Sequence, residues 1–156
     1  MSNKMRFQGK VALVTGSGRG IGKATLMRFA EEGASGVVVV DLMDERLDQA
    51  SSDLSSLGAD VLTFKADVTN YSDVKHVVRS TVDRFGHIDI LVNNVGASWG
   101  ATGLSVTEKD WDDIIDVNLK SQFMCIKEAV PHMKDKEYGR IINLSSSAGK
   151  YRSQWL

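Results

Sequence analysis

Short apolar runs alternate with segments of helical period along most of this chain. The runs are rich in valine and isoleucine, as in strands that are buried on both faces, and the amphipathic segments between them are typical of covering helices. This alternation predicts βαβ units that build a parallel sheet. Strands are expected at 11–15, 37–40, 61–65 and 88–92, with a fifth strand and its exit turn at 139–149, and helices at 21–32, 44–57, 72–85 and from 107 onward.

Residues at helical spacing support the helical segments. In the first helix the positions at helical spacing are Ile21, Ala24, Thr25, Arg28 and Phe29, and in the third they are Val74, Val77, Val78 and Val82. The helix from Thr107 begins with a variant capping box formed with Asp110. It carries a broad apolar face, and Pro131 and Gly139 bracket its end.

Composition limits the protein to one domain and a few function classes. The 156 residues are 42% hydrophobic and 25% charged, with a net charge of −1, which suits one soluble globular domain and gives no electrostatic case for nucleic acid or membrane partners. The N-terminus lacks the apolar core of a signal peptide, so we expect a cytoplasmic protein. Cys125 is the single cysteine and is expected to be a buried apolar residue, and His76, His87 and His132 lack metal-ligand spacing, so we predict no metal site.

A glycine-rich turn between the first strand and the first helix is the strongest motif. It runs Thr15-Gly16-Ser17-Gly18-Arg19-Gly20-Ile21-Gly22 and places backbone N–H groups and a helix N-terminus where a pyrophosphate can bind. The generic G-x-G-x-x-G pattern fails because Ile21 stands where its third glycine belongs. An ordinary glycine-rich turn is the alternative interpretation.

The end of the second strand bears on the choice of cofactor. Asp41 there suits the adenosine ribose hydroxyls and repels a 2′-phosphate, which favours NAD over NADP. Arg19, inside the glycine turn, favours the extra phosphate, and we give Asp41 the greater weight. Asp41 could also end the strand or cap the next helix, and neither role excludes ribose binding.

The spacing Thr-Gly-x-x-x-Gly-x-Gly resembles the short-chain dehydrogenase/reductase family. The resemblance extends from Phe7 to Gly149 and includes two later elements: Asp67-Val68, which in the family flanks the adenine, and Asn93-Asn94-Val95-Gly96, where the family usually has Asn-Asn-Ala-Gly. It implies a Rossmann-type doubly wound sheet with strand order 3-2-1-4-5. The family's later helices and last two strands have no counterpart here, so the single domain 1–156 looks incomplete at its C-terminal end.

The resemblance also implies catalytic residues. Ser146, which precedes a two-residue gap and a glycine, matches the family's serine, and Asn118 matches an asparagine whose backbone holds a water that links the catalytic lysine to solvent. A helix kink satisfied internally and a flexible serine turn are the structural alternatives. The family's Tyr-x-x-x-Lys pair should follow Ser146 by about a dozen residues, which lies beyond Leu156, and Tyr151 is too close. We therefore expect a longer natural chain, with an exposed edge strand and uncovered apolar helix surface in this part.

Three functions are consistent with these features. The first is an NAD-dependent oxidoreductase of the short-chain type that interconverts a secondary alcohol and a ketone as a homo-oligomer, dimer or tetramer. The second is a truncated, non-catalytic NAD-binding module, and the third is a nucleotide-sugar epimerase or a similar extended relative. The glycine-turn spacing and Asn93–Gly96 favour the shorter type. The substrate and the direction of reaction are not predicted.

Overall fold

The computed structural model describes residues 5–98 and 103–147 and contains one parallel sheet. Its strands pair in the order β3-β2-β1-β4-β5, as predicted. Their bounds are β1 Val11–Thr15, β2 Gly36–Asp41, β3 Val61–Lys65, β4 Ile90–Asn93 and β5 Arg140–Asn143. The segment 148–156, with Gly149 and Tyr151, lies outside the described residues.

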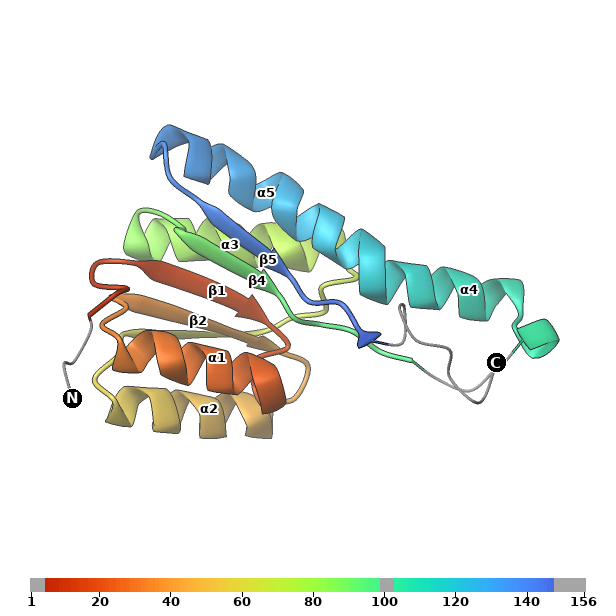
Figure 1. The fold of residues 1–156 in the computed structure, drawn as a ribbon, viewed down its shortest axis with the longest axis horizontal. Coiled ribbons are helices and arrows are strands. Elements are labelled where there is room, and N and C mark those ends of the chain that lie inside the picture. The colour runs from red at the N-terminus through yellow and green to blue at the C-terminus, as the bar shows by residue number, and fades with distance from the viewer. Residues whose placement is uncertain (1–4, 99–102, 148–156) are drawn as a thin grey trace.

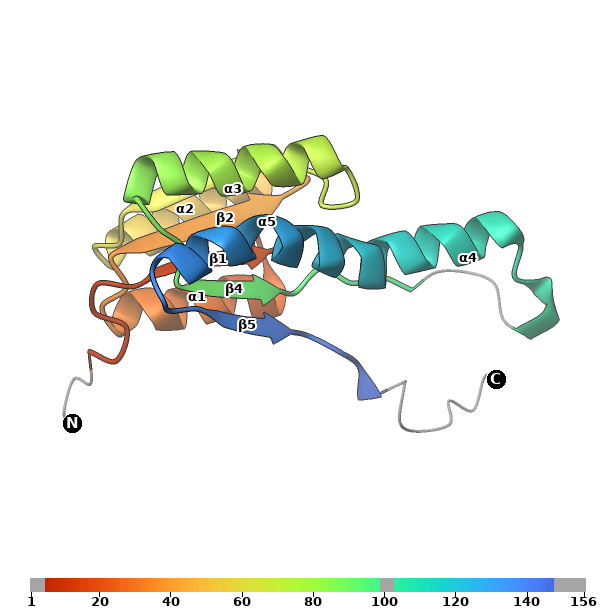
Figure 2. The same cartoon turned by 90° about the horizontal axis from the view of Figure 1, so that it is seen from above.

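Helices cover both faces of the sheet (Figure 1). One face carries α1 (Gly20–Glu31) and α2 (Asp44–Ser56), and the other carries α3 (Tyr71–Phe85) and α5 (Ser121–Asp135). A 3₁₀ turn at Gly103–Ser105 precedes α4 (Glu108–Ile115), which passes through the π-helical segment Asp116–Lys120 into α5. Figure 2 shows α4 extending well beyond the sheet.

The core explains the two-sided burial of the central strands. Every residue of β1 and β2 is buried, because alternate side chains point to opposite helical layers. Ala12 and Val14 pack with Leu26 of α1 and Leu47 of α2, whereas Leu13 belongs to the cluster on the side of α3 and α5. The valine runs that looked apolar throughout in the sequence are therefore the inner strands of a three-layer domain.

The residues at helical spacing that the sequence shows in the first helix are not the ones that the fold buries. The buried residues of α1 are Gly22, Leu26 and Ala30, while Ile21 is 68% exposed and Phe29 packs edge-on against Phe7. The reason is close approach: a Cβ on Gly22 would lie 2.7 Å from the Gly16 carbonyl oxygen, so the glycine side of the helix is the one that can press against the turn.

The fourth strand begins two residues later than expected, at Ile90. Ile88 and Asp89 are buried but precede the ladder. The Asp89 carboxylate accepts a hydrogen bond from the backbone N–H of Val11 at 2.8 Å and lies 3.0 Å from His87 Nε2. At the amino edge of the sheet, the buried Asp89 side chain thus accepts the Val11 N–H bond that a strand carbonyl would otherwise accept.

Several features of the long helix and the last strand match the sequence. The capping box of Thr107 and Asp110 is present, and α5 ends at Asp135, between Pro131 and Gly139. Strand β5 is an edge of the sheet with Ile141 and Ile142 partly exposed, and the helix exposes large apolar side chains at Trp111, Leu119 and Phe123. Among the described residues, no helix is long and apolar enough to cross a membrane.

Candidate functional site

The candidate site lies at the carboxyl edge of the sheet, where β1 and β4 are neighbours. The chain leaves β1 toward β2 and leaves β4 toward β5, so the order of strands reverses between them. In open parallel sheets such a switch point is where ligands bind. The glycine turn follows β1 and the Asn94–Gly96 segment follows β4, and thus both predicted motifs border the same point.

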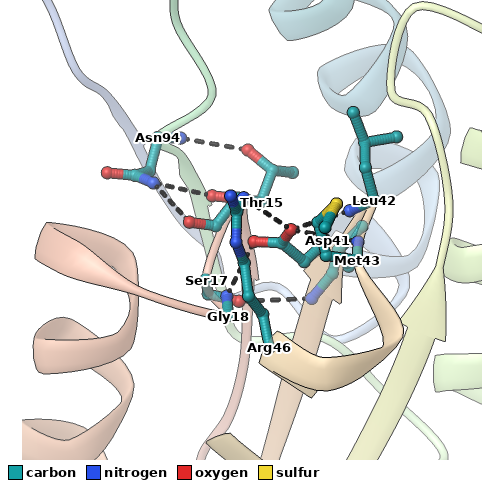
Figure 3. A network of polar contacts seen from close by, with 10 residues as sticks. Thr15, Ser17, Gly18, Asp41, Leu42, Met43, Arg46 and Asn94 are labelled. Carbon is teal, nitrogen blue, oxygen red and sulfur yellow. Dashed lines mark hydrogen bonds and ion pairs between the residues drawn. The ribbon is translucent and has the colours of Figure 1, made fainter. Parts of the chain in front are cut away.

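Hydrogen bonds of Thr15 and Asn94 join these two motifs (Figure 3). The Thr15 hydroxyl accepts hydrogen bonds from the backbone N–H groups of Asn94 at 3.0 Å and Val95 at 3.2 Å. In return the Asn94 amide donates to the carbonyl oxygens of Thr15 at 2.9 Å and Gly16 at 3.0 Å. Thr15 is 2% exposed, so its side chain fixes the shape of the site from beneath.

Ser17 serves the turn in a similar way. Its hydroxyl donates to the carbonyl oxygen of Val14 at 2.6 Å and accepts from the N–H of Val40 at 3.2 Å, and its own N–H donates to the carbonyl oxygen of Val40. The residue is fully buried. The sequence proposed Ser17 as a cofactor contact, and the structure places its side chain inside the protein, where it joins the turn to β2.

A hollow of about 440 Å³ opens above these loops, within the size range of small-molecule sites. Eight of the residues proposed for cofactor binding line it: Gly16, Arg19, Asp41, Asp67, Val68, Asn94, Val95 and Gly96. The other lining residues were not proposed for cofactor binding, and they are Val40, Leu42, Arg46, Ala66, Thr69, Ala97 and Val117. The sequence does contain a signal for Arg46. It is a basic residue in the first turn of the helix that follows the acidic end of β2.

The rest of the proposed cofactor residues shape the turn. Gly20 has a φ of +58° and a Cβ there would meet nothing within 4 Å, so this turn residue faces open space. Helix α1 starts at this residue, and its N-cap residue, Arg19, makes no side-chain capping bond. The first-turn N–H groups of an α-helix lack intrahelical acceptors. An open glycine backbone beside such a helix start fits a pyrophosphate.

The Asp41 carboxylate ties the end of β2 to the turn (Figure 3). Its Oδ2 accepts from the N–H of Gly18 at 3.1 Å, and its Oδ1 accepts from the N–H of Leu42 at 2.8 Å and of Met43 at 3.3 Å. Met43 is the N-cap residue of α2 and has no side-chain capping bond of its own. Asp41 therefore satisfies the backbone that enters α2 while it also lines the hollow.

Asn118 lies in the π-helical segment and holds the far wall of the hollow. Its Oδ1 accepts from the N–H of Ala97 at 3.1 Å, and its Nδ2 donates to the carbonyl oxygens of Ala97 at 2.8 Å and Ile114 at 2.9 Å. A Cβ on Gly96 would lie 3.1 Å from Asn118 Oδ1. The Asn118 side chain is therefore satisfied internally, in a π-helical segment, and π turns occur frequently at functional sites.

Comparison with known proteins identifies the family. The family model of the short chain dehydrogenase matches residues 10–156, which is most of the chain. The chain belongs to the short-chain dehydrogenase family. The dehydrogenase subunit BbsD of Thauera aromatica, named for a hydroxy(phenyl)methylsuccinyl-CoA, is 43% identical over 92% of this chain and 58% of its own length. The 3-oxoacyl-(acyl-carrier-protein) reductase FabG of Thermotoga maritima is 42% identical over 94% of this chain and 59% of its own.

Solved short-chain dehydrogenase structures share the fold. An NAD⁺-bound xylitol dehydrogenase superposes with a TM-score of 0.89 at 34% identity, covering 95% of this chain and 57% of that one. A 7α-hydroxysteroid dehydrogenase in complex with NADH superposes with a TM-score of 0.90 at 29% identity, covering 98% and 59%. The chain thus spans less than two thirds of the length of these relatives.

The proposed catalytic residues of the family pattern occupy different surroundings. Ser146 follows β5 and is exposed, whereas Asn118 is half-buried. Asn93, proposed for the cofactor site, is 2% exposed and donates to Asn143 Oδ1 at 2.8 Å, so it joins β4 to β5 beneath the loops. Within the described residues its Oδ1 has no partner. Asn93 and Asn143 thus lie at the ends of the neighbouring strands β4 and β5, and Ser146 follows β5.

A Tyr-x-x-x-Lys spacing does occur in this chain, at Tyr71 and Lys75. It precedes Ser146, whereas the family pattern places the pair after the serine. The Tyr71 hydroxyl donates to the Glu128 carboxylate, and Lys75 Nζ lies 5.0 Å from the centre of the tyrosine ring. Tyr71 is not among the residues that line the hollow. Tyr71 therefore joins α3 to α5, and this pair does not substitute for the expected acid–base pair.

Two remaining expectations concern side chains outside the hollow. Cys125 is 5% exposed, and burial raises the pKa of its thiol to about 12, so the side chain behaves as the small apolar residue that was predicted. In the described part of the chain, no group of three or more His, Cys, Asp or Glu side chains is arranged to hold a metal ion.

Proposed function

We propose that this chain binds a nicotinamide dinucleotide in the hollow and belongs to an oxidoreductase that interconverts a secondary alcohol and a ketone. The observation that carries the proposal is that the glycine turn, Asp41 and the segment Asn94–Gly96 border one hollow at the switch point of the sheet. Family membership supports it, because two solved relatives contain NAD⁺ or NADH.

The residues present fit each part of such a cofactor. The turn from Gly16 to Gly22 would hold the pyrophosphate, Asp41 would accept from a ribose hydroxyl, and Asp67-Val68 would flank the adenine. We expect NAD to be preferred over NADP, because the Asp41 carboxylate would repel a 2′-phosphate. When bound, the nicotinamide ring supplies or accepts the hydride.

The proposal gives this chain's own residues supporting roles in the reaction. The Ser146 hydroxyl would orient the substrate carbonyl and donate a hydrogen bond to the oxygen on which negative charge develops. Asn118 would hold a water through its backbone while its side chain fixes the wall at Ala97. A tyrosine and a lysine that follow Ser146 in a longer natural chain would exchange the proton, the ammonium lowering the pKa of the phenol.

Substrate, assembly and location complete the proposal. We expect a small-molecule alcohol or ketone, a homo-oligomer and a cytoplasmic site of action. The exposed apolar side chains of α4, the π-helical segment and α5, at Trp111, Leu119 and Phe123, would provide surface for contacts with a partner subunit or with further chain. No nucleic-acid or membrane partner is proposed.

Binding and turnover can be tested with the natural-length protein. NADH titration should show saturable fluorescence enhancement, and loss of the near-ultraviolet absorbance of NADH should follow when a suitable ketone is added. The panel should include a 3-oxoacyl thioester, an oxidised polyol and an oxosteroid, chosen because relatives are named for such compounds. Failure to bind either NADH or NADPH would refute the proposal.

Three neighbouring serines provide matched variants for the catalytic assignment. Ser146→Ala should lower kcat by about a hundredfold or more, as expected for loss of a donor to a developing oxyanion. Ser145→Ala and Ser147→Ala should retain rates close to that of the wild type. Equal effects of all three substitutions would show that Ser146 has no special role.

The alternative is an NAD-binding module without turnover. The intact mass of the protein from its natural source separates the two proposals. A mass well above 17.1 kDa supports the enzyme, and a mass that matches this chain, with NADH bound and no ketone reduced, supports the module.

A further inference from the structure

The Asp41 carboxylate has little capacity left for ribose hydroxyls. Besides the two backbone N–H groups described above, its Oδ1 lies 3.4 Å from Nη1 of Arg46, and its Oδ2 accepts from Gly18. The side chain of Asp41 is 5% exposed. Since each carboxylate oxygen has two lone pairs, Oδ1 already has more donors than it needs, and Oδ2 has room for one further donor.

Arg46 stands beside this carboxylate and also lines the hollow. It belongs to the first turn of α2, and its side chain is 35% exposed, so the guanidinium is partly open to a ligand (Figure 3). A Cβ on Gly18 would lie 2.7 Å from Arg46 Cβ. The base of the arginine side chain is therefore fixed against the glycine turn, while its long and weak contact with Asp41 leaves the head free to change partner.

A second cation lies across the same hollow. Arg19 is exposed, and in the part of the chain that the structure describes it has no carboxylate partner. Of the two lining carboxylates, Asp41 is paired with Arg46, and Asp67 accepts from the N–H and the hydroxyl of Thr69. The lining of the hollow thus includes two arginines, and the acid that should repel a phosphate has a counter-ion.

We propose that Arg46 determines how strictly the site selects between NAD and NADP. Paired with Asp41, it cancels the repulsion that this carboxylate exerts on a 2′-phosphate, and together with Arg19 it provides donors to that phosphate. Arginine suits this exchange, because its planar fork of N–H groups binds carboxylate and phosphate alike. The inference rests on the proposed dinucleotide site and makes the preference for NAD a modest one.

Titration of the natural-length protein with NADH and with NADPH tests the inference. The measured quantity is the ratio of the two dissociation constants, compared among wild type, Arg46→Gln, Arg46→Lys and a control, Arg79→Gln. Arg79 is 86% exposed on α3 and pairs with Asp83, away from the hollow. The control removes the same charge from the protein without touching the site.

Arg46→Gln should weaken NADPH relative to NADH by about tenfold or more, the loss expected when a hydrogen bond to a charged group is removed. Arg46→Lys should recover part of that ratio, and Arg79→Gln should leave it at the wild-type value. An unchanged ratio in Arg46→Gln with NADH still bound would overturn the inference, as would an equal shift in Arg79→Gln. If the wild type binds neither dinucleotide, the proposed function itself fails.

Discussion

Asn118 provides a direct test of how the fold holds the wall of the hollow. Its carboxamide makes three hydrogen bonds, two to the backbone of Ala97 and one to that of Ile114. One such bond contributes about 0.5–1.5 kcal/mol net to stability. Because Asn118 is half-buried and water can replace part of what is lost, we expect Asn118→Ala to lower the free energy of unfolding by about 1–3 kcal/mol.

Urea unfolding followed by circular dichroism measures this change, with the slope checked against that of the wild type. Hydrogen exchange gives a local measure, since the N–H of Ala97 loses its acceptor and should exchange faster. Gln49→Ala is a suitable control, because Gln49 makes an exposed contact with Asp53 and its removal should cost less than about 0.5 kcal/mol.

Asn118→Asp keeps the volume of the side chain almost unchanged and removes the hydrogen bonds that it donates. The carboxylate still accepts from Ala97 N–H, but it cannot donate to the carbonyl oxygens of Ala97 and Ile114 and would repel them. We therefore expect this variant to be at least as unstable as Asn118→Ala at neutral pH. If both variants unfold like the wild type and the Ala97 N–H exchanges at an unchanged rate, the carboxamide does not hold the wall.

Two further predictions concern the glycine turn and the amino edge of the sheet. Gly22→Ala should lower the free energy of unfolding in urea by about 1–3 kcal/mol, because the added Cβ would meet the backbone oxygen of Gly16. The control Ala24→Ser, on the exposed face of α1, should change it little. Equal stabilities of the two variants would contradict this prediction. A hydrogen bond from Arg6 lowers the pKa of Glu32 below its ordinary 4.5. The ionised Glu32 therefore contributes its full stability above pH 4.5, and this contribution is lost as the pH falls through the lowered pKa. Glu32→Gln should therefore be less stable than the wild type at pH 7 and approach it in acid, and a gap that stays constant with pH would argue against the ion pair.

Much of the architecture is predictable from local pattern. The buried valine runs gave the strands and their two-sided cover, and the spacing of the glycines gave the turn between β1 and α1. The capping box at Thr107 was predictable because it depends on side chains three residues apart. Such features need only short-range geometry, which the order of residues contains.

The candidate site was predictable as a set of motifs but not as an arrangement of contacts. Ser17 looked like a cofactor residue because it stands in the glycine turn, yet its hydroxyl joins the turn to Val40, far along the chain. Arg46 went unnoticed because its importance depends on the approach of α2 to Gly18 and Asp41. Residue spacing along one chain segment carries no information on which distant backbone groups remain unsatisfied.

The sequence by itself determined the alternation of strands and helices, the position of the glycine turn and the acid at the end of β2. The tertiary structure alone decided which face of α1 is buried, how Asn118 is satisfied in a π-helical turn, and that Asp41 shares its carboxylate between Gly18, the start of α2 and Arg46. The physical reason is that secondary structure follows from periodicity within a segment, whereas burial and hydrogen-bond partners depend on which segments the fold packs together.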